Sequence, residues 1–155
     1  MKQVLIDTDV ILDFLFDRKP FSEESSQILS FCENGKIKGF VTSIMSSNIY
    51  YLLKKTAKHD KVISDLKILM SIIEVTTTNK KTVLDALNSD IKDFEDARQN
   101  FSAQNNPEIK VIIKRNIKDY KTSNLSIMTP ETYLKPIQST SLKNPTIQQS
   151  KDPTI

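Results

Sequence analysis

The sequence contains few of the residue types on which most enzyme mechanisms depend. Its 155 residues include one cysteine, one histidine, two glycines and no tryptophan. One cysteine excludes an internal disulfide and a cysteine-based zinc site, and one histidine excludes a multi-histidine metal centre. Two glycines are too few for a glycine-rich phosphate loop or a GxGxxG dinucleotide fingerprint. The polar side chains that remain plentiful are carboxylates, amides, hydroxyls and lysines.

Long hydrophobic runs are also absent. No window approaches the ~18 consecutive apolar residues of a membrane-spanning helix. Asp7, Asp9 and Asp13 interrupt the apolar N-terminal stretch that a signal peptide would need. We therefore expect a cytoplasmic protein without membrane contact. The length and the 38% hydrophobic content indicate one globular domain.

The net charge is +3 and the isoelectric point is near 8.9, which is mildly basic. Positive charge is concentrated between residues 110 and 121, where four lysines and one arginine accompany a single acid, Asp119. From charge alone this segment is either a solvated surface or a contact for a polyanion such as nucleic acid.

Short apolar segments alternate with helical patterns over residues 1–137. Strands are expected at 3–7, 38–42, 74–77, 109–113 and 125–128, and helices between them and after Thr129. This alternation predicts a three-layer α/β/α sandwich around a mainly parallel sheet of four to five strands. Residues 138–155 lose the pattern, and we expect them to form a disordered or loosely attached tail.

Several carboxylates and amides fall where these segments end. Asp7 ends the first expected strand, Asp93 and Asp96 open a helix, and Asn116 and Asp119 follow the fourth strand. Ligands of a parallel sheet bind beyond the carboxyl ends of its strands, and clustered oxygens suit Mg²⁺ or Mn²⁺. The same positions are also common for helix caps and turns.

Helical spacing assigns three further residues to structural roles. Asp13 is expected on a solvated helix face. Tyr50 and Tyr51, beside two leucines, are expected in the core rather than stacked on bases.

Four blocks of the sequence resemble the PIN domain family, in the branch that includes VapC-type toxins. The blocks are VLIDTDVILDFL, DFEDARQNFSA, VIIKRNIKDY and MTPETYL, and they keep their order and spacing over residues 3–137. The resemblance implies a parallel-sheet α/β/α sandwich and endonuclease activity on single-stranded RNA. It further implies an acidic cluster that binds Mg²⁺ or Mn²⁺, an antitoxin protein as partner, and a homodimer.

The resemblance transfers roles to individual positions. It implies metal binding by Asp7, Asp96, Asp93 and Asp119, and catalysis by Asp7, Asp96, Asp93 and Asn116. Contacts to RNA are expected from Thr8, Ser43, Asn48, Lys114, Arg115 and Lys118. One position departs from the family, because Asn48 stands where a glutamate ligand is expected.

Two functions remain open on these residues. The first is a Mg²⁺- or Mn²⁺-dependent endoribonuclease, which the resemblance connects with the toxins of toxin–antitoxin pairs. The second is a catalytically weakened PIN-fold module that binds nucleic acid or protein. Neutral amides at Asn48 and Asn116 favour the second function, whereas Asp7 and Asp96 favour the first.

Overall fold

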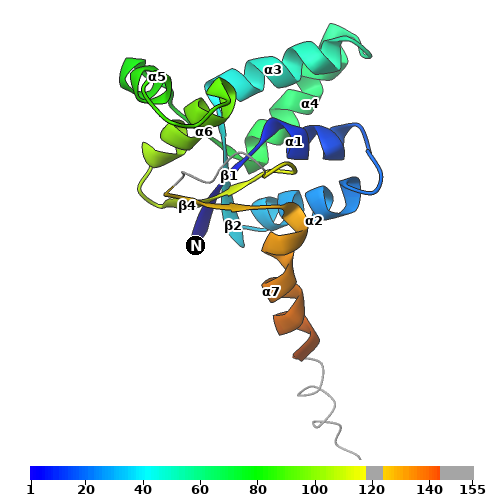
Figure 1. The fold of residues 1–155 in the computed structure, drawn as a ribbon. Helices are drawn as coiled ribbons and strands as arrows, with labels where there is room; N and C mark the ends of the chain where they lie inside the picture. Colours follow the sequence, from blue (N-terminus) through cyan, green and yellow to red (C-terminus); the bar gives the residue numbers. More distant parts are fainter. Residues whose placement is uncertain (118–123, 144–155) are drawn as a thin grey trace, which may run out of the picture.

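Five parallel strands form the central sheet, in the spatial order β3-β2-β1-β4-β5 (Figure 1). The computed structural model describes residues 1–117 and 124–143, with side chains to residue 136. The strands are β1 (Lys2–Ile6), β2 (Ile37–Thr42), β3 (Glu74–Thr76), β4 (Ile109–Ile113) and β5 (Ser126–Met128). This architecture confirms the predicted α/β/α sandwich.

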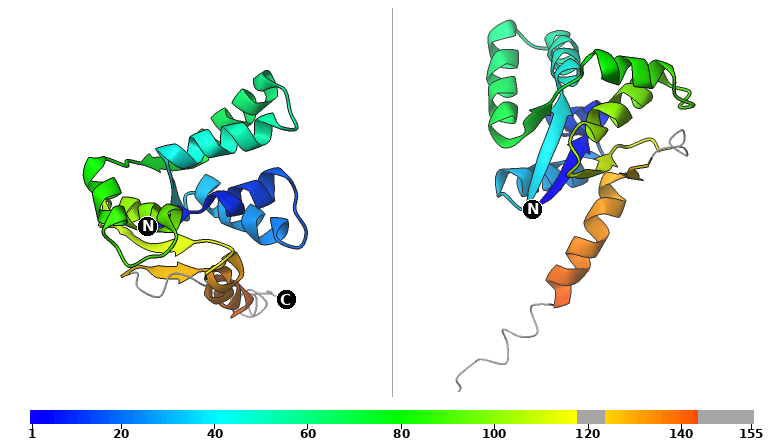
Figure 2. Two further views of the ribbon diagram at one scale, coloured as in Figure 1. Left: turned by 45° about the horizontal axis from the view of Figure 1, so that its top comes forward. Right: turned by 90° about the vertical axis from the view of Figure 1, so that its left-hand side faces the viewer.

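Helices cover both faces of the sheet. They are α1 (Thr8–Leu15), α2 (Ser22–Glu33), α3 (Ser43–Lys54), α4 (His59–Ile72), α5 (Lys80–Leu87), α6 (Phe94–Gln104) and α7 (Pro130–Lys143). Figures 1 and 2 show α5 and α6 paired on one side of the strands, and α1, α2 and α4 on the other. No helix in the described ranges is both long and apolar enough to cross a membrane.

Strand β1 lies at the centre of the sheet because it pairs with β2 on one side and β4 on the other. The chain adds β2 and β3 in one direction, then returns past β1 to add β4 and β5 in the other. This reversal is a topological switch point, and ligands of open α/β sheets bind in the crevice beside it. The residues that follow β1 and β4 therefore lie at the position where a site is expected.

The core consists mainly of aliphatic side chains from the strands and from the helices packed on them. Leu5 and Ile6 of β1 and Ile112 and Ile113 of β4 are fully buried. Such continuous apolar runs are typical of parallel strands, which are covered on both faces. A rigid sheet therefore supports the polar residues at its carboxyl edge.

Two features differ from the sequence expectations. Helix α7 continues to Lys143, past the boundary expected after residue 137. Residues 144–155 lie outside the described part, so the two-part organisation stays a prediction.

Asp13 is not on a solvated face: it is 1% exposed, and its Oδ1 accepts a hydrogen bond from Arg115 Nη1 at 2.9 Å. Helical periodicity places a residue on a face, but does not show that a distant arginine covers it.

Candidate active site

A groove of about 570 Å³ lies at the carboxyl edge of the sheet, at the switch point between β1 and β4. Its floor comes from the residues after these strands, and its walls from α3 and α6. The groove is lined by Asp7, Thr8, Asp9, Asn48, Tyr51, Leu52, Lys55, Asp93, Glu95, Asp96, Gln99, Lys114 and Asn116. Seven of the residues predicted for the site therefore meet in one place: Asp7, Thr8, Asn48, Asp93, Asp96, Lys114 and Asn116.

Asp7 is held at the base of the groove by the end of β1. Its backbone N–H donates to the Ile113 carbonyl of β4 at 2.9 Å, which continues the strand pairing by one residue. Although Asp7 occupies the N-cap position of α1, its side chain makes no capping hydrogen bond. Instead its Oδ1 accepts from Gln99 Nε2 at 2.6 Å. The Asp7 carboxylate is therefore held by Gln99 of α6 and lines the groove.

Burial changes the acidity of Asp7. The residue is 5% exposed, and loss of hydration raises the pKa of its carboxyl above the usual value. The positive charge of Lys114 acts in the opposite direction, and the negative charge of Asp9 adds to the increase. A positive charge in the groove would therefore stabilise the ionised form of Asp7.

Asp96 lies in the first turn of α6 and faces the same groove. Its Oδ1 accepts from the Lys114 ammonium, with Nζ at 2.6 Å, and both side chains are largely buried. The contact joins the start of α6 to the residue that follows β4. The groove therefore contains a cation of the protein itself beside one of its two principal carboxylates.

Two other residues of the α6 segment have different roles. Asp93 is the N-cap of α6, and its Oδ1 accepts from the Asp96 backbone N–H at 3.0 Å. Asp93 thus performs the capping function that its position suggests, while it also lines the groove. Gln99, one turn after Asp96, is 1% exposed and positions Asp7. Sequence reasoning missed Gln99, although its spacing of three from Asp96 places both on one helix face.

Helix α3 forms the opposite wall. Asn48, Tyr51, Leu52 and Lys55 line the groove at the spacing of one helix face. Tyr51 is 67% exposed, so the expectation that it belongs to the core is wrong. Its neighbour Tyr50 does pack against the core, and its hydroxyl lies 2.9 Å from His59 Nδ1. The two tyrosines differ because successive helix positions point about 100° apart.

Thr8 presents a buried hydroxyl to the groove. Its Oγ1 is inaccessible to solvent and has no hydrogen-bond partner within the described ranges. Buried hydroxyls without a partner are uncommon, because losing hydration without compensation costs about 1–3 kcal/mol. The Thr8 hydroxyl therefore has an unused hydrogen-bonding capacity beside the groove.

The remaining predicted site residues lie elsewhere or outside the described ranges. Ser43 begins α3 and is exposed, but does not line the groove. Arg115 turns away from it, pairing with Asp13 and lying 4.6 Å from the centre of the Phe21 ring. Lys118 and Asp119 fall between residues 117 and 124 and lie outside the description.

The donor atoms of the groove fit a hard divalent cation. Asp7 and Asp96 supply carboxylates, and Asn48 and Asn116 supply amide oxygens, which together form the all-oxygen set that Mg²⁺ and Mn²⁺ prefer. No group of three or more His, Cys, Asp or Glu side chains in the described ranges is arranged to hold a metal. Such a site therefore depends on two carboxylates and on neutral oxygens.

Comparisons with known proteins point to one family. The model of the PIN domain matches residues 3–118. Ribonuclease VapC1 of Aquifex aeolicus is 26% identical over 137 residues, which cover 85% of this chain and 93% of the relative. The match thus extends over nearly the full length of both proteins.

Solved structures share the fold. A toxin–antitoxin complex from Klebsiella pneumoniae contains a chain with a TM-score of 0.61 and 21% identity, covering 82% of this chain and 97% of its own. The DNA-bound VapBC structure from Salmonella typhimurium gives a TM-score of 0.62 at 14% identity. That match covers 84% of this chain and 99% of the solved chain. At these identities the likeness shows the common architecture.

Proposed function

The chain belongs to the PIN domain family, and from this premise we propose that it is a divalent-metal-dependent endoribonuclease acting on single-stranded RNA. The observation that carries the proposal is the meeting of Asp7 and Asp96 in one groove. These residues are far apart in sequence, and they come together at the switch point of the sheet, where α/β proteins bind ligands. The similarity to a ribonuclease supports the same substrate class.

Asp7 and Asp96 are the proposed metal ligands, with amide oxygens of Asn48 and Asn116 beside them. A divalent ion held there would lower the pKa of a bound water and neutralise charge on a phosphodiester. Gln99 keeps the Asp7 carboxylate in place through its 2.6 Å hydrogen bond. The Thr8 hydroxyl is buried without a partner in the described ranges, and a local shift of its side chain would let it donate to a phosphate oxygen.

The wall formed by α3 is the proposed track for the RNA strand. Tyr51 offers an exposed ring on which a base can stack, and Lys55, one turn further on, offers a positive charge to the backbone. Stacking and phosphate contacts of this kind bring affinity without much sequence choice. Arg115 is not part of this track, because it pairs with Asp13.

The second candidate is a PIN-fold binding module with little catalysis. It is favoured by Asn48, which brings no charge to the groove, and by the ion pair that Asp96 makes with Lys114. The two candidates share the groove and the RNA-binding wall. They differ in whether a metal ion binds tightly enough to act.

We further propose that the protein is the toxin of a toxin–antitoxin pair and works in the cytoplasm. The support is the family and the likeness to chains from toxin–antitoxin complexes. The partner would be an antitoxin protein, and self-association into a homodimer is part of the same proposal. Co-purification of the chain with the product of a neighbouring gene, followed by measurement of the complex mass, tests both partners.

Cleavage of a mixed RNA pool by the full chain tests the function. The pool is incubated with Mg²⁺, with Mn²⁺ and with EDTA, using the wild type, Asp7→Asn and a control, Asp65→Asn. Asp65 is a carboxylate on α4 that pairs with Lys61, away from the groove. We expect cleavage that needs the metal, persists in Asp65→Asn and falls at least about 100-fold in Asp7→Asn.

Three results separate the candidates. Metal-dependent cleavage that Asp7→Asn abolishes supports the nuclease. RNA binding without cleavage in either metal supports the binding module. Neither binding nor cleavage of any RNA in the pool contradicts both the nuclease and an RNA-binding module.

A further inference from the structure

Lys114 occupies an unusual place for a lysine. It is 7% exposed, and its ammonium lies 2.6 Å from Asp96 Oδ1, at the base of an acidic groove. Exposed lysines of this chain also pair with acids, such as Lys81 with Asp85 at 2.8 Å, but Lys114 differs from them in being buried. A largely buried lysine keeps its charge only where an opposite charge compensates for lost hydration. Lys114 therefore depends on the groove carboxylates.

The groove carboxylates in turn depend on Lys114. The charge of Lys114 lowers the pKa of Asp7, which burial raises, so the ammonium acts on both principal carboxylates. Gln99 adds only a neutral hydrogen bond to Asp7. Lys114 is therefore a cation that acts on both Asp7 and Asp96.

The position of Lys114 is set by the fold and not by a flexible surface chain. Its backbone N–H donates to the Met128 carbonyl of β5 at 2.9 Å, so the residue extends the pairing of β4 with β5. The side chain leaves the sheet edge toward the first turn of α6, where Asp96 lies. A charge fixed in this way is present in the groove before any ligand arrives.

We propose that the Lys114 ammonium is a built-in counter-ion that competes with divalent cations for Asp96 and sets a low metal affinity for this groove. A divalent ion that binds both carboxylates comes within a few ångströms of the ammonium, where like charges repel strongly in a partly buried site. Metal binding then requires Lys114 to leave Asp96. The inference rests on the proposed metal site but not on RNA cleavage.

Binding of Mn²⁺ alone to the full chain, measured by titration calorimetry, tests the competition. Lys114→Met removes the charge and nearly preserves the length of the side chain. We expect this variant to bind Mn²⁺ about tenfold or more tightly than the wild type, because the repulsion and the competing partner are both lost. Adding Asp96→Asn to Lys114→Met should remove the gain.

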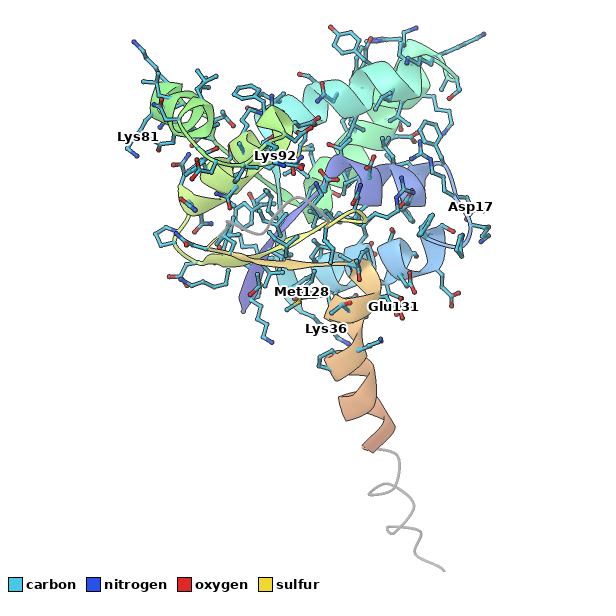
Figure 3. All side chains as sticks on the ribbon, in the orientation of Figure 1. Asp17, Lys36, Lys81, Lys92, Met128 and Glu131 are labelled. Carbon is cyan, nitrogen blue, oxygen red and sulfur yellow. The ribbon has the colours of Figure 1, made fainter. Side chains whose placement is uncertain are left out.

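A matched control is available on α5. Lys81 pairs with Asp85 at 2.8 Å and does not line the groove, and Figure 3 shows it on α5 at the edge of the molecule. Lys81→Met therefore removes the same charge from another lysine–aspartate pair, and we expect unchanged Mn²⁺ affinity. A dissociation constant for Lys114→Met within twofold of the wild-type value, or no Mn²⁺ binding by that variant, would overturn the proposal.

A second measurement needs no substitution and so does not depend on the folding of a variant. The ¹H–¹⁵N resonance of the Lys114 ammonium is followed in the wild type during a Mg²⁺ titration. We expect this resonance to move or broaden as Mg²⁺ binds, while that of Lys81 stays constant. An unchanged Lys114 signal at saturating Mg²⁺ would contradict the competition, whether or not the chain cleaves RNA.

Discussion

Asp7 is the residue at which stability and proposed function oppose each other. Burial raises the pKa of its carboxyl, so the folded chain disfavours the ionised form, which would bind a metal, more than the unfolded chain does. An ionised Asp7 therefore lowers the free energy of unfolding. The protein retains a group that destabilises its fold, as is common at functional sites.

The stability effect of Asp7 has a definite sign. Because its pKa is higher in the folded chain than in the unfolded chain, its contribution to the free energy of unfolding falls as pH rises from 3.8 through the raised value. Asp7→Asn should therefore melt at a higher temperature than the wild type at pH 7. The difference should shrink as the pH is lowered toward 3.8, as measured by thermal melts over a pH series.

The control for Asp7→Asn is Asp65→Asn, which alters an exposed surface pair and should change the melting temperature little. If Asp7→Asn melts below the wild type at pH 7, the ionised carboxylate stabilises the fold and our reasoning on burial is wrong.

A second prediction at the residue scale concerns RNA binding by Tyr51. Its ring is exposed in the groove, so Tyr51→Ala should leave the melting temperature unchanged but weaken binding of single-stranded RNA by about 1–3 kcal/mol. Tyr51→Phe keeps the ring and should bind like the wild type. Fluorescence anisotropy with a labelled oligonucleotide in EDTA measures binding without cleavage.

Leu84→Ala is the matched control for Tyr51→Ala, because Leu84 is also exposed but lies on α5. Equal RNA affinity of Tyr51→Ala and the wild type would show that no base stacks on this ring.

At the scale of elements, β2 and α2 approach each other closely at Gly39. A Cβ atom at this position would lie 2.7 Å from Cys32 Sγ and 2.9 Å from Ile6 Cδ1. Both distances are below normal contact, so Gly39→Ala should lower the free energy of unfolding by about 1–3 kcal/mol. Urea denaturation measures the loss.

The steric origin can be separated from a general effect of alanine on β2. The double variant Gly39→Ala, Cys32→Ala removes the shorter of the two contacts and should lose less stability than the sum of the single variants. Strict additivity would show that the Cys32 contact is not the cause.

The elements were largely predictable from the sequence, whereas the side-chain partners were not. Apolar runs and caps are local signals, so the strands and the order of the helices followed from them. The groups around Asp7 come from elsewhere in the chain: Gln99 from α6 and Lys114 from the end of β4. Local pattern reveals a strand end or a helix face, but not which distant group faces it.

The same limit explains the errors in single residues. Asp13 and Tyr51 both lie on helices predicted correctly, yet each was assigned the wrong environment. Asp13 is covered by Arg115, about a hundred positions away, and Tyr51 is uncovered because the groove opens beside α3. Only the packing of distant elements decides such cases. The family resemblance found Asp7 and Asp96, but gave no reason to expect the Lys114 ion pair.

For the whole molecule, the central position of β1 predicts a gradient of local stability. β1 has paired neighbours on both sides, whereas β3 and β5 are three-residue strands at the edges of the sheet. Backbone amides of Val4–Ile6 should therefore exchange with deuterium most slowly, and those of β3 and β5 much faster. Hydrogen-exchange mass spectrometry measures this. Equal protection of β1 and β5 would contradict the gradient.

The pairing of β1 with β4 also has a consequence for synthesis on the ribosome. Asp7 emerges among the first residues, but Asp96, Gln99 and Lys114 follow about 90 to 110 positions later. A nascent chain that ends before β4 therefore has no groove, even if its helices have already formed. On the proposed function, the nascent chain would therefore gain its RNA-cleaving groove only after β4 has been made.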